Sequence, residues 1–286
     1  MSSFVIIDAS YFIIYRTFAL LSFWKRKIEN KNKKITELHK DNEFINNFKK
    51  TFIKKLKELE QYVKKSKDIT YIIAKDCNRN NIWRKSLYSD YKKNRDGKTN
   101  DLHIPSFFDI VWRENLFDVL SENNKVFYLE HENLEGDDCA AIATKYILKN
   151  CTNLNEILIF TADTDYLQLL QIGKYKNNIR ILTLKFENLQ TEKNSTGFPI
   201  KDLKIKILMG DKSDNIPSVF NRCGKKTAEK YCNNTDKLRN DLQKVNKNGH
   251  SYMEQYHLNY KLIAFDAIPD GFCEYIENIL SINLPF

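Results

Sequence analysis

Glycine and proline are scarce in this chain, with eight glycines and five prolines in 286 residues. No stretch has the composition of a Pro/Gly/Ser-rich linker, and no internal repeat is present. The length suits one large domain or one and a half. An apolar content of 42% supports a sizeable core. The clearest boundary is Glu187–Phe198, which predicts one part at residues 1–198 and a helical, basic part at residues 199–286.

Cysteine pairs and histidine clusters are also missing. The six cysteines form no CxxC pair, and none lies near histidine at zinc-ligand spacing. Cys139 and Cys151 fall in apolar patterns, where a small buried thiol is expected. The five histidines do not cluster, so we assign them no chemistry. The sequence therefore predicts neither a zinc site nor a disulfide framework.

Long apolar runs are absent as well. No run approaches the roughly 20 residues that a membrane span needs. The first apolar run, Phe4–Ile7, ends at Asp8 and is too short for a signal peptide. We therefore expect a soluble, intracellular monomer without a membrane partner. It would lie in a reducing compartment, which is the host cell if a virus or phage encodes it.

Positive charge is in excess, with a net charge of +9 and a pI of about 9.0. Such a balance favours acidic partners, nucleic acid first among them. Solubility alone would account for the charge equally well.

Buried-strand patterns alternate with helical patterns over the first two-thirds of the chain. Strands are expected at Phe4–Ile7, Ile69–Ala74, Lys125–Leu129, Glu156–Phe160 and Ile179–Leu184. Helices are expected at Ala9–Phe23, Glu43–Val63, Ser106–Leu120, from Asp138 to Lys149, and Tyr166–Leu170. Hydrophilic loops are expected at Lys25–Lys40 and Lys92–Asp101. This alternation predicts an α/β fold with a mostly parallel sheet flanked by helices.

The densest acidic stretch is Leu134–Ala141, where three carboxylates occupy four positions just before a helical pattern. These are Glu135, Asp137 and Asp138. Ionised groups this close repel one another, so a cation must offset them.

Acids follow other predicted strands too, namely Asp8, Asp76, Asp163 and Asp165. A single acid after a strand is most often an N-cap or turn residue. Four strand ends carrying acid toward one edge of a parallel sheet indicate a shared site instead.

Oxygen ligands without histidine or cysteine select Mg²⁺ or Mn²⁺ over zinc. More acids than one ion needs indicate two ions about 4 Å apart, an arrangement that activates water and stabilises the leaving oxygen in phosphodiester hydrolysis. Asp211 and Asp214 add further acid, on one face of a helical turn, unless Asp214 or Asn215 only caps the next helix. Aspartyl-phosphate phosphatases use a similar layout. They need a second Asp two residues after the first, where this chain has Ser10.

Taken in order, these residues resemble the flap endonuclease or 5′-nuclease family, and its bacteriophage ribonuclease H branch most closely. The resemblance spans almost the whole chain and rests on Asp8, Asp76, Trp83–Lys85, Tyr91–Arg95, Glu135–Asp138, Asp163–Leu170, Gly210–Pro217 and Tyr260–Asp266. Gly136 stands where the family usually has alanine. The resemblance implies a PIN-like catalytic core with a helical arch at about residues 83–120.

The resemblance also implies roles for single residues. The implied metal ligands are Asp8, Asp76, Glu135, Asp137, Asp163, Asp165, Asp211 and Asp214. Asp138 is expected to support the ligands or to cap the helix. Lys92 and Arg84 are expected to act in catalysis, with Lys92 steadying the scissile phosphate. The arch stretch is expected to bind nucleic acid through Arg84, Tyr88, Tyr91, Lys92, Lys93 and Arg95, although a solvated amphipathic helix would have a similar composition.

A helix-hairpin-helix-like element is implied at Ser218–Ala228, gripping duplex backbone through Gly224, Lys225, Lys226 and Thr227. Asn221 or Arg222 stands where the family has a second glycine, which leaves no basis for predicting a monovalent-cation site there.

The function predicted is a nuclease that uses two Mg²⁺ ions, with Mn²⁺ able to substitute. It would cut 5′ ends or flaps of duplex DNA and RNA annealed to DNA, as in RNA-primer removal during replication or repair. A single-strand-binding protein is a further candidate partner, as is a sliding clamp docked by the tail Ser281–Phe286, although a frayed apolar end is commoner. The alternatives are a non-catalytic protein that recognises branched DNA and, more weakly, a PIN-type ribonuclease. The full set of acids favours the enzyme.

Overall fold

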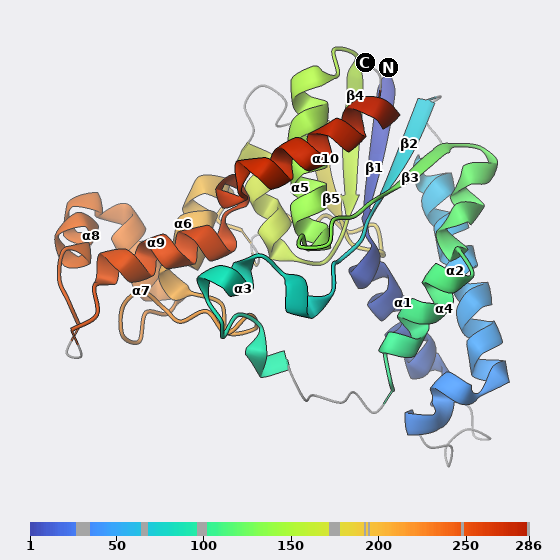
Figure 1. Cartoon of the computed structure of the whole chain (residues 1–286), viewed down its shortest axis with the longest axis horizontal. Helices are drawn as coiled ribbons and strands as arrows, with labels where there is room; N and C mark the ends of the chain where they lie inside the picture. Colours follow the sequence, from blue (N-terminus) through green and yellow to red (C-terminus); the bar gives the residue numbers. More distant parts are fainter. Residues whose placement is uncertain are drawn as a thin grey trace.

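The computed structural model describes residues 1–26, 35–63, 68–95, 102–171, 178–191, 193, 195–246 and 249–284. Its centre is a five-stranded parallel sheet with the order β3-β2-β1-β4-β5 (Figure 1). The strands are β1 (Ser2–Asp8), β2 (Asp68–Ala74), β3 (Lys125–Leu129), β4 (Leu154–Phe160) and β5 (Ile179–Leu182). All five predicted strands are confirmed, and β5 ends two residues earlier than expected.

Helices cover both faces of the sheet because its strands are apolar on both sides. Val5 and Ile7 point into a core shared with α1 (Ala9–Trp24), α2 (Asn42–Val63), α4 (Pro105–Arg113) and the 3₁₀ helix η5 (Leu116–Glu122). Phe4 and Ile6 point into the opposite core, shared with α5 (Gly136–Asn150), the 3₁₀ helix η6 (Thr164–Gln171) and α10 (Asp270–Asn283). The alternation of side chains along each strand therefore builds the three-layer fold.

Helix α2 shows how the sequence pattern becomes packing. Its apolar side chains recur every three or four residues, and all six predicted for the inner face are buried: Phe44, Phe48, Phe52, Leu56, Leu59 and Val63. Burying each such side chain stabilises the folded state by about 1.5–3 kcal/mol. This helix therefore anchors its side of the sheet by burial rather than by intrinsic helix propensity.

The strand order reverses at β1, since the chain runs from β1 through β2 to β3 on one side and to β4 and β5 on the other. Asp8 lies at the carboxyl end of β1, in register with Ala74 at the end of β2. Open parallel sheets bind ligands at such a switch point. The fold thus places the predicted acids where a site is expected.

The C-terminal third is helical, as predicted. Helices α6 (Pro199–Met209), α7 (Lys225–Asn233), α8 (Thr235–Leu242) and α9 (Tyr252–Ile263) enclose a small core of their own. Buried Asn259 of α9 ties this part together, because its Nδ2 donates to the carbonyls of Ile207 and Pro217, each at 2.8 Å. Helix α10 then returns across α5 toward the amino end of β1 (Figure 1).

Three local predictions need correction. The segment Ile35–Lys40, expected as loop, is a 3₁₀ helix with Leu38 buried, and residues 27–34 lie outside the described residues. The single helix expected at Ser106–Leu120 is two, because Asn115 at φ 48° ends α4 and starts η5. The loop expected at Lys92–Asp101 includes a 3₁₀ turn at Lys93–Arg95, and residues 96–101 are not described.

The C-terminal tail is packed as far as it is described. Leu284 is buried in the core beside α5, just after α10 ends at Asn283, so the described part of the candidate clamp-docking tail is neither frayed nor a free peptide. Pro285 and Phe286 lie outside the described residues. Over the described ranges, no helix is both long and apolar enough to cross a membrane.

Candidate active site

Asp8 joins two strand ends. Its Oδ1 accepts from the backbone N–H of Tyr11 at 2.9 Å and so caps α1, while its Oδ2 accepts from the Thr161 hydroxyl at 2.9 Å, just past β4. Burial, with the neighbouring charge of Asp76, raises the pKa of Asp8 to about 7. A nearby cation would therefore stabilise the ionised form of Asp8 and lower its pKa.

Asp76 faces Asp8 and explains the unexpected glycine at position 136. The N–H of Gly136 donates to Asp76 Oδ1 at 2.6 Å, and the Ser10 hydroxyl donates to Asp76 Oδ2. A Cβ on Gly136 would lie 3.1 Å from Asp76 Oδ1 and 3.2 Å from the carbonyl of Ala74. Glycine thus lets the start of α5 approach β2 closely. Ser10, which replaces the second Asp of an aspartyl-phosphate phosphatase, serves here to hold Asp76.

The cation required by the acidic stretch is Arg84. Its guanidinium donates to both oxygens of Asp138, each at 2.7 Å, and to Glu135 Oε2 at 3.1 Å. The indole N–H of Trp83 donates to Asp138 Oδ2 at 3.0 Å. Asp138 is fully buried, and with Glu135 it forms the capping box that starts α5. Asp138 therefore lies behind Glu135 with both oxygens already bonded, an arrangement that fits a supporting or helix-capping role.

Arg84 and Tyr91 are corrections to the predicted nucleic-acid contacts. Each is only 2% exposed. Arg84 Nε donates to the carbonyl of Leu262 at 2.8 Å, and the Tyr91 hydroxyl donates to Glu135 Oε2 at 2.9 Å. A phosphate cannot reach that guanidinium, and no base can stack on that ring. Both side chains organise the carboxylates from inside.

Lys92 and Arg95 lie beside the carboxylates of Glu135 and Asp214. They belong to the stretch between β2 and β3 that begins with α3 (Arg84–Leu87). The Lys92 ammonium contacts Glu135 and lies 3.7 Å from Asp214 Oδ2, while its backbone N–H donates to the Asp214 carbonyl at 2.8 Å. Burial disfavours the charge, but Glu135 and Asp214 outweigh burial and raise the pKa of Lys92 above its ordinary value. Arg95 pairs with Asp214.

Lys93 and Tyr88 stand apart from the acids. Lys93 is exposed and pairs with Asp90 at 2.9 Å. Tyr88 is half-buried and packs against a separate apolar cluster that includes Leu262 and Ile263 of α9. The structure therefore brings Lys92 to the carboxylates and leaves Lys93 on the surface.

Lys206 is a site residue that sequence reasoning missed. From α6 its ammonium contacts Asp165 and lies 3.0 Å from Asp211 Oδ2. Burial raises the pKa of Asp165 to about 6 in spite of Lys206. Burial also opposes the charge of Asp211, but Lys206 and Ser213 outweigh it and lower the pKa of Asp211 to about 2. No sequence signal marked Lys206, because it is one of three lysines in α6.

Asp163 completes this side of the site. Its backbone N–H donates to the Thr161 hydroxyl at 3.1 Å, and its Oδ1 accepts from the N–H of Asp165 at 2.9 Å. Asp163 is exposed, so it lies at the mouth rather than at the bottom of the site.

The last acidic motif is a closed turn and not the expected helical turn. The N–H groups of Asp211 and Ile216 each donate to the other's carbonyl, at 2.9 and 2.7 Å. Gly210 makes this possible at φ 68°, since a Cβ there would lie 2.4 Å from the carbonyl oxygens of Ile216 and Pro217. Asp211 and Asp214 therefore project from a hairpin-like turn. Neither Asp214 nor Asn215 caps a helix, because α7 begins only after Gly224.

The acids converge. Asp137, Asp165, Asp211 and Asp214 line one small cavity, and carboxylate oxygens of Glu135, Asp137 and Asp138 lie within 4.8 Å of one another. Burial and the charge of Asp138 raise the pKa of Asp137 well above its ordinary value. This donor set of oxygens alone fits a hard divalent cation.

The hydroxyl of Tyr166 is a second sign of such a cation. Tyr166 is 0% exposed, and its hydroxyl has no hydrogen-bond partner among the described residues. Burial, then the charges of Asp8 and Asp137, raise the pKa of this hydroxyl. Buried hydroxyls in native proteins nearly always have a partner. A hydrated cation among these carboxylates would supply one.

A groove of about 970 Å³ leads from the acids to the hairpin between α6 and α7. Its lining includes Asp165, Asp211, Arg222 and Lys225. Gly224 caps α7, and Lys225, Lys226 and Thr227 are exposed on its first turn. Gly224 has φ −90° and open space beside it, whereas Arg222 takes the left-handed conformation at φ 55°. The positive φ in this loop is therefore taken by arginine rather than by a glycine.

Comparison with known proteins agrees with this geometry. A family model described as the 5′-3′ exonuclease N-terminal, resolvase-like domain matches residues 3–197. The chain belongs to this family. It is therefore a nuclease, and the predictions of the family, the fold and the enzyme class are confirmed.

Relatives of this 5′-nuclease come from phages and bacteria. Ribonuclease H of Enterobacteria phage T4 is 28% identical over 239 residues, 78% of this chain and 74% of that protein. A 5′-3′ exonuclease of Buchnera aphidicola is 28% identical over 182 residues, 61% of this chain and 57% of that protein. The bacteriophage T5 D15 flap endonuclease, solved with DNA and metal ions, has the same fold, with a TM-score of 0.63 at 17% identity over 98% of this chain and 99% of that one.

Proposed function

We propose that this 5′-nuclease hydrolyses phosphodiester bonds at 5′ ends and flaps of duplex DNA and in RNA annealed to DNA, serving RNA-primer removal in replication or repair. The observation that carries the proposal is that Asp137, Asp165, Asp211 and Asp214 line one cavity. Asp165 and Asp211 also line the groove toward α7, and Asp8 lies at the neighbouring end of β1. The phage T4 relative, a ribonuclease H, supports the hybrid substrate. The T5 flap endonuclease with DNA supports the flap.

The cofactor proposed is a pair of Mg²⁺ ions, with Mn²⁺ able to substitute. The ligands would be Asp8, Asp76, Glu135, Asp137, Asp163, Asp165, Asp211 and Asp214. When bound, such ions make water nucleophilic at neutral pH and offset charge on the leaving oxygen. The chain's own part is to fix these oxygens, through Ser10 and Gly136 on Asp76 and through Arg84 on Glu135.

Lys92 and Lys206 would be the cations that meet the substrate. Both ammonium groups lie against acids of the site, and both have pKa values raised above the ordinary range, so they stay charged at neutral pH. With the carboxylates neutralised by bound cations, both lysines would be available to contact phosphate oxygens. Lys92 would steady the scissile phosphate, with Arg95 beside it.

The start of α7 would hold the duplex. The backbone N–H groups at a helix N-terminus attract phosphate, and exposed Lys225 and Lys226 add positive charge there. The proposed division places catalysis in residues 1–198, with an arch at about 83–120, and duplex binding in residues 199–286. Residues 96–101 of that arch lie outside the described residues.

A cleavage assay tests this function. A 5′-labelled flapped duplex and a labelled RNA–DNA hybrid are each incubated with the protein and Mg²⁺, Mn²⁺ or EDTA, with Asp137→Ala as the control for contaminating nuclease. We expect metal-dependent cleavage of both substrates by the wild type alone. Tight flap binding without cleavage in either metal would instead make the protein a non-catalytic recogniser of branched DNA.

A further inference from the structure

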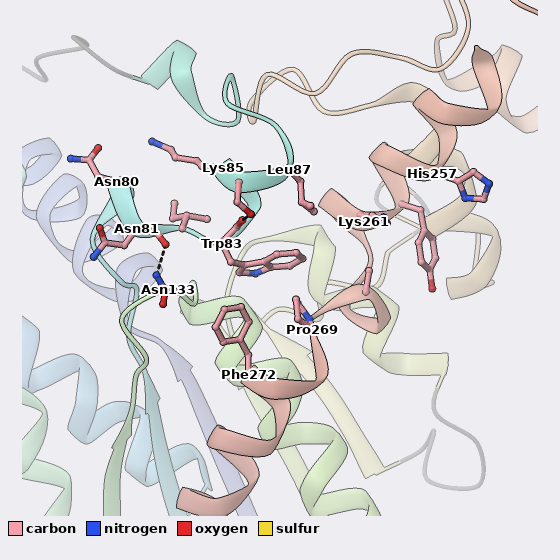
Figure 2. A pocket seen from close by; sticks show the side chains of 14 residues that line it. Asn80, Asn81, Trp83, Lys85, Leu87, Asn133, His257, Lys261, Pro269 and Phe272 are labelled. Atoms are coloured by element: carbon pink, nitrogen blue, oxygen red, sulfur yellow. Dashed lines mark hydrogen bonds between the residues drawn. The ribbon is translucent and has the colours of Figure 1, made fainter. Parts of the chain in front are cut away.

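A second groove, of about 1050 Å³, lies outside the active site between α3, α9 and the start of α10 (Figure 2). We propose that it docks a segment of a partner protein that is acidic and carries a large apolar side chain. This inference does not rest on the proposed substrates, since none of the predicted metal ligands lines the groove.

The floor of the groove is apolar. Trp83 and Phe272 lie next to each other on it, with ring centroids 6.5 Å apart, and Pro269 lies beside them (Figure 2). Ile82 also lines this surface. Leu87 stands at the edge with 41% of its surface exposed. Burying apolar surface contributes about 25 cal/mol per Å². An inserted leucine or phenylalanine side chain would therefore stabilise a complex at this place.

The rim of the groove is positively charged. Lys85 lines the groove from α3, and Lys261 lines it from α9 beside the polar ring of His257. Neither lysine forms an ion pair within the described part of the chain, and the described lining contains no aspartate or glutamate. Because no carboxylate of the described lining neutralises Lys85 or Lys261, these lysines would attract carboxylates of a partner.

The rings in this groove suit a protein better than a nucleic acid. Trp83 is only 7% exposed, its N–H is bonded to Asp138, and the Arg84 guanidinium lies 4.7 Å from its ring centroid. Bases bind single-strand sites by stacking on open aromatic faces. Trp83 has no such face to offer, whereas the aliphatic edge at Leu87 is open to a side chain.

Two exposed positions allow docking to be tested apart from cleavage. Leu87 and Lys261 lie at the rim of the groove, and neither side chain contacts the carboxylates of the active site. The variants are Leu87→Ala and Lys261→Glu. Exposed Lys149 in the last turn of α5 gives a matched charge reversal, Lys149→Glu, away from the groove.

The experiment is fluorescence anisotropy on the full chain. The probe is a fluorescein-labelled, aspartate-rich peptide with one central phenylalanine. Its controls are a copy with asparagine for every aspartate, a copy with alanine for the phenylalanine, and a single-stranded oligonucleotide as competitor. We expect saturable binding that needs both the acids and the ring, weakened about tenfold by each groove variant and unchanged by Lys149→Glu. Flap cleavage by Lys261→Glu and by Lys149→Glu should equal that of the wild type.

Several outcomes would overturn the proposal. These are the absence of saturable peptide binding, equal binding of the neutral copy, affinity unaffected by Lys261→Glu, or displacement of the peptide by the oligonucleotide. Lys261 is exposed, so its substitution tests the proposal even if Leu87→Ala lowers stability.

Discussion

At the residue scale, the site is a set of carboxylates held by internal donors. Asp76 is fixed by Ser10 and Gly136, Asp138 by Trp83 and Arg84. Asp138 is fully buried, so Trp83 and Arg84 satisfy oxygens that would otherwise lack a partner, at a cost of about 1–3 kcal/mol. Asp76 is exposed, so Ser10 and Gly136 serve to orient it. The acids are therefore oriented before any cation binds, and single side chains can be tested one by one.

Tyr166→Phe removes only the buried hydroxyl that has no partner among the described residues. In EDTA we expect the variant to be as stable as the wild type, or more so, because an unpaired polar group leaves the core. With the cation, we expect about fivefold weaker Mn²⁺ binding, the equivalent of one hydrogen bond of about 1 kcal/mol. Calorimetric titration and thermal unfolding in EDTA measure the two effects. Unchanged Mn²⁺ affinity would contradict the role given to the hydroxyl.

Lys92→Ala tests the cation closest to Glu135. We expect the single-turnover rate to fall by about 10²–10³, as for loss of one preorganised charge, with little change in duplex binding. The matched control is Lys93→Ala, because Lys93 is exposed and pairs with Asp90 rather than with an acid of the site. If Lys92→Ala lowered the rate and the duplex affinity equally, Lys92 would contribute to substrate binding and not specifically to catalysis.

At the element scale, helix starts and one tight turn position the chemistry. Asp8 caps α1, Glu135 caps α5, and Gly224 starts α7 at the far end of the groove. The Gly210 turn brings Asp211 and Asp214 up to the same cavity. Helix N-termini favour negative charge. The starts of α1 and α5 therefore stabilise carboxylates at one end of the groove, and the start of α7 would attract phosphate at the other.

The start of α7 predicts a salt effect. Replacing Lys225 and Lys226 together by alanine should weaken duplex binding and lower the slope of log affinity against log salt by about two. The rate at saturating substrate should not change. Lys230→Ala, in the last turn of the same helix, serves as the control. A double variant with an unchanged salt slope would mean that α7 does not touch the phosphates.

At the scale of the whole molecule, the sheet and its acidic edge could be predicted from the sequence, because buried runs and helical periods are local signals. The directions of single side chains could not. Arg84 and Tyr91 share the composition of a nucleic-acid-binding stretch, yet the packing of α3 against α9 buries both. Lys206 gave no signal, since only the fold brings α6 beside η6. Gly136 became intelligible only once β2 and α5 were seen in contact.

The whole carboxylate cluster should make stability depend on pH and metal. Asp8 and Asp165 have pKa values raised to about 7 and about 6, so the folded protein holds protons there that the unfolded chain has lost. In EDTA, their stabilising contribution is complete below about pH 4 and is lost as pH rises through 6 and 7. Mg²⁺ at pH 8 should restore it.

Denaturant unfolding of the wild type and of Asp8→Asn across pH 4–8, with EDTA or Mg²⁺, measures this dependence. The variant should show a flatter loss of stability with rising pH in EDTA, because it cannot ionise at that position. If the wild type in EDTA is no less stable at pH 8 than at pH 5, the raised pKa values of Asp8 and Asp165 are contradicted.

The central claim is that acids from separate strand ends hold divalent cations at the switch point of the sheet. Anomalous diffraction from crystals soaked in Mn²⁺ tests it most directly, with Asp137→Ala crystals for comparison. We predict two peaks about 4 Å apart among these carboxylates, with at least one lost in the variant. Wild-type crystals without a peak there, or peaks unchanged in Asp137→Ala, would contradict the account.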